Sequence, residues 1–589
     1  MTRLAVFLLA LLLLSSAAGQ VMNDADVGAG SLRQAIADAV DGDTITFDGS
    51  LAGQTITLAL GELNTTLNNL TIDASALANP VTIDADNNSR IFNHTGTGTF
   101  AIDSLVISNG NAGDGGGIFS SGNVSVTNSS ISGNTAGNGG GIRSAGNVSV
   151  TNSSISSNIA SSNGGGIASD NTVILNDSSV SSNTATNGGG IANAHIGSIT
   201  INNSSVSGNT ASNGGGGVIS ASNVTVTNST ISDNKAGNEG GGIRSASNVT
   251  VTNSTISDNE AGIEGGGINS IGDVVIQAGS SVLRNEADTG GGIVSGGSIT
   301  LISSTVADNT AESAGGGMVS SGTTTVLASS SVTGNTVTNG NGGGMHSNDA
   351  VTIVDSNISG NTASGAGGGI RGIGTVLITG GSSVLNNQAS LGGGIRSDGN
   401  VTVNGGSSVS DNESSGAGGG IHSDSNVEIN SSTVSGNQAG DAGGGMFSNG
   451  NVLVVAGSTV SGNQAGGSGG GIASDGSINI QNSNISDNKS GGAGGGIGSN
   501  GNIEIANSII TNNQATDAGS GIRGIGTLSL FGCVRVEGNV STASDFQWRI
   551  NGTVNGGDLA SLREDDYQGP DCPVVPIPPS VGGVAEPLF

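Results

Sequence analysis

Apolar and polar residues alternate in short runs along most of this chain, and the pattern recurs about every 25 residues. One repeat, residues 240–261, reads GGGIRSASNVTVTNSTISDNEA and contains no helical period. Val249, Val251 and Ile256 are apolar with Ser and Thr between them, which is the period-two alternation of half-buried strands. The odd step from Val251 to Ile256 predicts a corner at Asn253-Ser254. We therefore expect three short strands and three corners in each repeat.

A glycine triplet followed by an aliphatic residue opens each repeat, and we call these aliphatic residues the anchors. A fixed period of this length is typical of a stacked array in which each coil pairs its backbone with its neighbours. The pattern therefore predicts an all-β parallel solenoid of about 25 residues per coil. The anchors are Ile118, Ile142, Ile167, Ile191, Val218, Ile243, Ile268, Ile293, Met318, Met345, Ile370, Ile395, Ile421, Met446, Ile472, Ile497 and Ile522.

An asparagine follows three residues after the aliphatic residue of each third strand. Asn tolerates left-handed conformations at corners. Stacked at about 4.8 Å, its side-chain amides can bond along the stack as a ladder. We predict a structural ladder of Asn134, Asn158, Asn183, Asn209, Asn234, Asn259, Asn285, Asn309, Asn335, Asn361, Asn387, Asn412, Asn437, Asn463, Asn488 and Asn513.

The repeats resemble two groups of bacterial right-handed parallel β-helix proteins. GGGI and the later Ile131-Ser132-Gly133-Asn134 resemble the GGAI and FxxN tetrapeptides of the polymorphic outer membrane protein repeat, with an aliphatic residue in place of Phe. Gly30-Ser31-Leu32-Arg33-Gln34-Ala35 resembles the CSLREA motif that precedes other β-helices, with Gly for Cys and Gln for Glu. The resemblance implies a single-stranded right-handed parallel β-helix with a pectin lyase-like fold and a bacterial source.

The flanks of the repeat array differ from it in composition. We expect a signal peptide over 1–19, an N-terminal cap and irregular first coils over 20–100, and regular coils over 101–530. A C-terminal cap over 531–572 and a Pro-rich tail over 573–589 should follow. Within the N-terminal cap, Ser31 and Gln34 have the spacing of a capping box, which predicts a short helix across the open first coil.

Charge and cysteine content limit the classes of partner and the cellular compartment that we expect for the chain. The chain has 589 residues, with 44 acidic against 14 Lys and Arg, and a net charge of −30, which disfavours nucleic acid as a partner. An acidic surface can attract Ca²⁺, but no specific site is indicated, and no cofactor is predicted. Cys533 and Cys572 are the only cysteines, and an even pair in an exported chain predicts one disulfide. The signal peptide and the lack of a later long apolar run predict an exported monomer without a transmembrane segment.

The residue after each anchor should point outward, because it follows an inward aliphatic residue on a strand. In four consecutive coils that residue is His346, Arg371, Arg396 or His422, and in three others it is Arg143, Arg244 or Arg523. The row of four predicts a shallow binding stripe for an anionic polysaccharide such as a uronate. The alternative is that these cations pair with acidic neighbours such as Asp355 or Glu428.

No catalytic constellation stands out in the sequence. Glycoside hydrolysis needs two carboxyl groups about 5–9.5 Å apart, and Glu428 and Glu504, on equivalent outward sites, lie three coils apart. The four His are scattered, and no metal ligand set or nucleophile elbow is present. We therefore predict a secreted or cell-surface protein with a non-catalytic role in adhesion or carbohydrate binding. A polysaccharide lyase or glycoside hydrolase on a pectate-lyase-like β-helix is the second interpretation. An ice-binding solenoid with Thr-x-Thr rows, such as Thr225/Thr227, is a third.

Overall fold

The chain forms two compact units, residues 1–374 and 375–589, each a parallel β-solenoid. The computed structural model describes residues 19–542, 548–550, 554–555 and 567–568. Each coil takes about 25 residues and the helix is of the right-handed parallel type, so the predicted fold class is confirmed. Within the described residues, α1 (Leu32–Asp38) is the one α-helix.

Each regular coil carries four strands, one more than the hydrophobic pattern predicts. In one coil these are β30 (Ile243–Ser245), β31 (Val249–Thr252), β32 (Thr255–Ser257) and β33 (Glu260–Ala261). We name the four resulting faces the anchor sheet, the second sheet, the third sheet and the fourth sheet. The fourth strand was missed because two residues are too few to display alternation.

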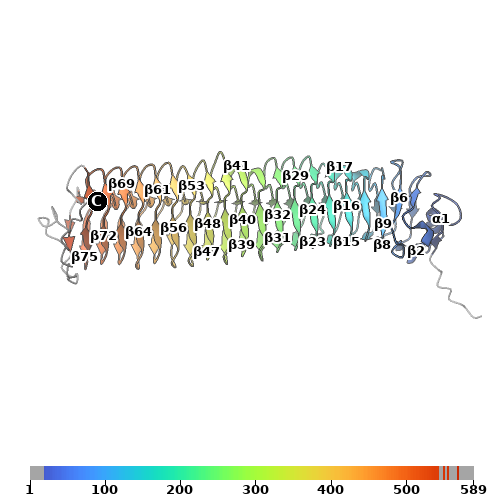
Figure 1. The fold of residues 1–589 in the computed structure, drawn as a ribbon, viewed down its shortest axis with the longest axis horizontal. Coiled ribbons are helices and arrows are strands. Elements are labelled where there is room, and N and C mark those ends of the chain that lie inside the picture. The colour runs from blue at the N-terminus through green and yellow to red at the C-terminus, as the bar shows by residue number, and fades with distance from the viewer. Residues whose placement is uncertain (1–18, 543–547, 551–553, 556–566, 569–589) are drawn as a thin grey trace, which may run out of the picture. The chain divides into compact units, whose positions relative to one another are not determined.

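Strands of successive coils stack along each sheet (Figure 1), and their parallel pairing places equivalent core positions side by side. On the anchor sheet Ile243 pairs with Val218 on one side and with Ile268 on the other. All three side chains are fully buried, as are Val251 and Ile256 of the next two sheets. The core is therefore a set of aliphatic columns, one for each inward position of the coil.

The glycine triplet lets neighbouring coils approach closely at one corner. Gly240 adopts a φ of +65°, a conformation that side chains other than Gly rarely adopt. A Cβ on Gly242 would lie 2.6 Å from the carbonyl oxygen of Gly267 in the next coil, and a Cβ on Gly241 would meet the oxygen of Gly266. The first glycine thus supplies the turn, and the other two supply the close backbone approach.

The asparagines of the predicted ladder lie inside the solenoid, with at most 1% of each exposed. Asn209 is typical: its Nδ2 donates to Asn234 Oδ1 at 2.9 Å and to the Val180 oxygen at 3.0 Å. Its Oδ1 accepts from the backbone N and the Nδ2 of Asn183, both at 3.0 Å. The Asn209 amide therefore closes four buried hydrogen bonds. The same bonds extend to Asn539, which the sequence prediction omitted.

The N-terminal region joins the same sheets through β2 (Asp43–Phe47), β5 (Leu70–Asp73), β6 (Val81–Asp84) and β8 (Thr99–Asp103). At α1, Ser31 Oγ accepts from the Gln34 backbone N at 3.2 Å. The Gln34 side chain instead donates to Asp38 at 2.9 Å, so only one half of the predicted capping box forms.

Arg33, the arginine of the CSLREA-like segment, fastens the helix to the first coil. Its guanidinium bonds Asp26 Oδ1 at 2.7 Å and donates to the backbone oxygens of Gly61 and Glu62 at 2.6 and 2.7 Å. The other Asp26 oxygen, Oδ2, accepts from the backbone N atoms of Ala59 and Leu60. The contacts that the structure describes for Arg33 therefore hold α1 against the first coil.

At the other end, coil strands continue past residue 530 into the segment expected to be a cap. They include β75 (Leu528–Phe531), β76 (Arg535–Glu537) and β77 (Val540–Ser541), and β78 (Trp548–Ile550) pairs in parallel with β74 (Ile522–Gly524). Cys533 is disulfide-bonded, and its predicted partner Cys572 lies outside the described residues. So do residues 1–18 of the expected signal peptide and the expected tail 573–589. No helix of the described residues is long and apolar enough to span a membrane.

Candidate binding groove

Five consecutive strands of the anchor sheet in the first unit present an uneven outward face. They are β14 (Ile142–Ser144), β18 (Ile167–Ser169), β22 (Ile191–Asn193), β26 (Val218–Ser220) and β30. The residues after their anchors are, in order, Arg143, Ala168, Ala192, Ile219 and Arg244. Two alanines in the middle leave space that long side chains occupy at the ends.

Two adjoining cavities open over these alanines. One, of about 150 Å³, is lined by residues that include Asp114, Asn138, Arg143, Ala168 and Asp170. The other, of about 340 Å³, is lined by residues that include Asn187, Ile219 and Arg244. Both are also lined by Asn163, Ala192 and Ala194, so they form one depression. We call it the anchor-sheet groove. The larger cavity alone lies within the usual range of ligand sites, about 300–1,000 Å³.

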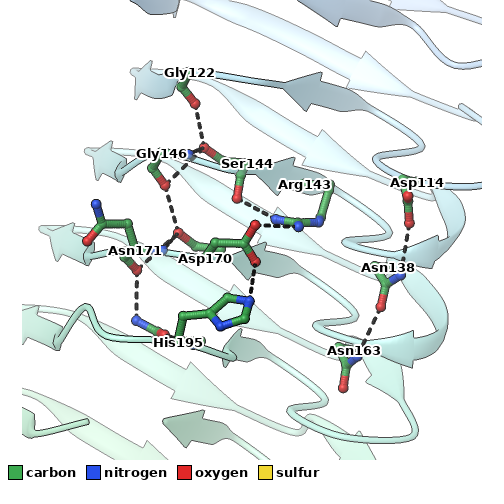
Figure 2. A network of polar contacts seen from close by, with 12 residues as sticks. Asp114, Gly122, Asn138, Arg143, Ser144, Gly146, Asn163, Asp170, Asn171 and His195 are labelled. Carbon is green, nitrogen blue, oxygen red and sulfur yellow. Dashed lines mark hydrogen bonds and ion pairs between the residues drawn. The ribbon is translucent and has the colours of Figure 1, made fainter. Parts of the chain in front are cut away.

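A row of side-chain amides forms one wall of the groove, as Figure 2 shows for its first members. Asn138 Nδ2 donates to Asp114 Oδ1 at 2.9 Å, and Asn163 donates to Asn138 at 3.0 Å. Asn187 donates to Asn163 at 3.2 Å, and the row continues through Asn213 and Asn238. All these bonds run in one direction, toward the Asp114 carboxylate. The row arises because each Asn precedes the corner glycine, or stands close before it, in successive coils.

An ion pair borders the groove at its first end (Figure 2). Arg143 donates to Asp170 Oδ2 at 2.6 Å and to the Ser144 carbonyl at 2.5 Å. His195 Nε2 lies 3.6 Å from the other Asp170 oxygen, and the His195 side chain is 64% exposed. The Asp170 carboxylate is thus engaged by residues from two neighbouring coils.

At the opposite end, Arg244 Nε donates to Glu239 Oε2 at 2.5 Å. Both guanidinium groups of the groove are therefore bonded to carboxylates, and Asp114 adds a further negative charge. Within the described lining, each arginine thus has a carboxylate partner, and the smaller cavity, beside Asp114 and Asp170, disfavours a further carboxylate.

The four cations of the predicted stripe are found in the two units as two pairs of neighbours. His346 lies beside Arg371 in the first unit, and Arg396 lies beside His422 in the second. Arg396 bonds Asp424 at 2.6 Å and Asp398 at 3.1 Å, and its side chain is 13% exposed. Arg396 thus pairs with Asp424 and Asp398. The acidic neighbours named from the sequence were Asp355 and Glu428.

His422 follows the strand alternation but is buried, with only 8% exposed, against the expectation of an outward, accessible imidazole. Its ring packs on Phe447 with centroids 4.9 Å apart, and Nδ1 lies 3.4 Å from the Ala417 oxygen. Burial lowers the pKa of His422, and the Arg396 charge lowers this pKa further. Such a histidine is poorly suited to bind an anion from solvent, because burial disfavours its charged form.

Two other hollows lie on different faces of the first unit. The larger, about 650 Å³, runs along the corner between the second and third sheets and is lined mainly by Asn and Ser. The other, about 370 Å³, lies on the fourth sheet beside Glu260, Glu286, Asp288 and Glu312. Glu260 is paired with Lys235 at 2.6 Å, and Asp288 accepts from Ser313. Among the described residues, no group of three or more His, Cys, Asp or Glu could hold a metal ion.

The predicted stripe and the groove both lie on the anchor sheet, but at different positions along it. The sequence prediction looked for large charged side chains after the anchors, whereas the cavities open where that residue is Ala168 or Ala192. The available signal was the run of small residues between two arginines at one register. A comparison with protein-family models finds no match, and a search of the curated proteins finds none either.

Proposed function

We propose that this protein is an extracellular carbohydrate-binding β-helix, and that it holds a polysaccharide in the anchor-sheet groove without cleaving it. The observation that carries the proposal is the elongated depression over Ala168 and Ala192, walled by amides. Amide groups both donate and accept, as sugar hydroxyls require. The resemblance of the GGGI repeats to bacterial surface proteins supports an exported setting and an adhesive use.

A non-catalytic role is the better proposal because the carboxylates of the groove already have partners. Asp114 accepts from Asn138, and Asp170 is bonded to Arg143. A hydrolase needs one carboxyl group to donate a proton and another to act as base or nucleophile. The groove contains no such free pair, and the acidic residues of the fourth-sheet hollow Glu260, Glu286 and Glu312 are exposed.

Filling the groove tests the proposal. Ala192→Arg places a long side chain at the same outward position that Arg143 and Arg244 occupy two strands away on either side, so folding should survive. Ala473→Arg is the matched control, since Ala473 is the buried residue after an anchor in the second unit. On an array of immobilised neutral and uronate polysaccharides, the wild type and Ala473→Arg should bind, and Ala192→Arg should lose about 90% of the signal.

Two results would contradict the proposal. Equal binding by Ala192→Arg and the wild type would place any glycan elsewhere on the chain. Release of shortened or unsaturated sugars from a bound polysaccharide would instead assign the chain to the lyases or hydrolases, and it would overturn the non-catalytic role.

A further inference from the structure

The anchor-sheet groove presents one floor residue and one wall residue in each coil. Its floor changes from Arg143 to Ala168, Ala192, Ile219 and Arg244 in steps of one strand. Strands in a sheet lie about 4.8 Å apart, which is close to the length of one sugar ring in an extended glycan. A chain lying along the stack would therefore meet one floor residue and one wall residue at each successive ring.

The amide wall has a direction as well as a period. Each Nδ2 from Asn138 to Asn187 donates toward Asp114, and each amide oxygen of Asn138 and Asn163 accepts from the next coil. An amide has two N–H donors and two acceptor sites. Asn138 and Asn187 each donate once along the row in the described contacts, which leaves each a second N–H for a ligand. A row of this kind distinguishes the two directions of a polar polymer.

The charge of the groove separates neutral from acidic glycans. Arg143 and Arg244 are bonded to Asp170 and Glu239, and Asp114 lines the same cavity as Asp170. In the smaller cavity a uronate carboxylate would face Asp114 and Asp170, and Arg143 there is already bonded to Asp170 and to the Ser144 carbonyl, which makes a further carboxylate unfavourable in a partly enclosed site. Hydroxyl groups meet no such penalty, and Ala192 and Ile219 offer apolar surface to the C–H face of a ring.

From these three features we infer that the groove is specific for an extended, uncharged glycan, bound along the stack in one direction with one ring opposite each coil. This inference rests on the proposed carbohydrate-binding function and adds the class of ligand to it. The three strands β18, β22 and β26 would accommodate about three rings, because the side chains of Arg143 on β14 and Arg244 on β30 close the floor at both ends.

The inference can be tested with two matched series of soluble probes. One consists of β-1,4-linked glucose oligomers of increasing length, and the other of the same oligomers oxidised to uronates. Calorimetric titration should show affinity for the neutral series rising about fivefold per added ring and levelling after about three rings. The uronate of the same length should bind about tenfold more weakly or not at all.

A pair of variants addresses the amide row. Asn163→Asp removes the donor to Asn138 and adds a charge, and it should weaken binding of the neutral pentamer about tenfold. The control is Asn228→Asp, in a separate exposed row where Asn228 donates to Asn203 at 3.1 Å, and it should leave binding within about twofold.

The outcomes distinguish a failure of the inference from a failure of the proposed carbohydrate-binding function. Tighter binding of the uronates, an affinity that does not grow beyond two rings, or equal losses in both variants would overturn the inference while leaving a carbohydrate-binding protein. Failure of both series, together with a blank polysaccharide array, would overturn the proposed function itself.

Discussion

The anchor sheets of the two units carry the same ion-pair motif with opposite consequences for the surface. Arg143 and Arg396 each donate one guanidinium nitrogen to the next residue's carbonyl and another to an aspartate of the following coil, at 2.6 Å. A histidine lies near the other aspartate oxygen in each case, His195 at 3.6 Å and His422 at 3.8 Å.

The difference lies in where that histidine originates. His195 comes from a corner two coils away and is exposed, so the outward position next to Arg143 is held by Ala168 and a cavity remains. In the second unit, His422 itself occupies the outward position next to Arg396 and packs on Phe447. Side-chain volume at one register thus decides whether equivalent ion pairs border a cavity or a filled surface.

The largest expected effect is a loss of stability when the asparagine ladder, which both units contain, is interrupted. Asn209→Ala and Asn437→Ala should each lower the free energy of unfolding by on the order of 3 kcal/mol, because several buried groups lose their partners. Asn437 has the same bonds as Asn209, to Asn463 Oδ1 and the Val409 oxygen among others. Denaturant titration of both variants measures this. A neutral effect in either unit would show that the ladder does not stabilise both alike.

Exchanging the residues at the outward position next to Arg143 and Arg396 should remove the difference between the surfaces of the two units. Ala168→His gives the first unit the ring that the second carries at His422, and it should lower affinity for a neutral glycan about tenfold. The reciprocal His422→Ala should leave that affinity within about twofold. Calorimetry with the neutral pentamer measures both. Full affinity in Ala168→His would mean that cavity volume is not what distinguishes the two faces.

The smallest expected effect is on pH dependence. The folded chain resists protonating His422, whose pKa is lowered, first by burial and then by Arg396; Asp424 acts in the opposite direction. An unfolded chain protonates it below about pH 6.5, so unfolding becomes easier as pH falls below that value. His422→Phe keeps a ring against Phe447 but cannot titrate.

Denaturation midpoints at about pH 7.5 and pH 5.5 should therefore differ less in His422→Phe than in the wild type. His94, buried between Ser120 and the Leu67 oxygen with a lowered pKa, should retain the rest of the dependence. An unchanged pH dependence in the variant would show that His422 is not kept neutral by the fold.

Features that repeat with the coil could be predicted from the sequence. The anchors and the ladder asparagines recur at one register, and stacking places each beside its equivalent in the next coil, as for Ile243 and Ile268. Features that depend on different residues in neighbouring coils could not. The pairing of Arg143 with Asp170 joins residues 27 apart, which no periodic argument selects from the other acidic residues.

The sequence by itself determined the parallel solenoid, its coil length, the inward columns and the glycine corner. Each of these follows from a local conformational preference that recurs in every repeat, and stacking equivalent residues of successive coils satisfies all of these preferences together. Only the tertiary structure decided the groove. A cavity is the space left when Ala168 and Ala192 lie between larger side chains, and a buried His422 is the result of Phe447 covering it. The groove and the burial of His422 both depend on the side-chain volumes of residues in several coils. These residues become neighbours only when the stack has formed.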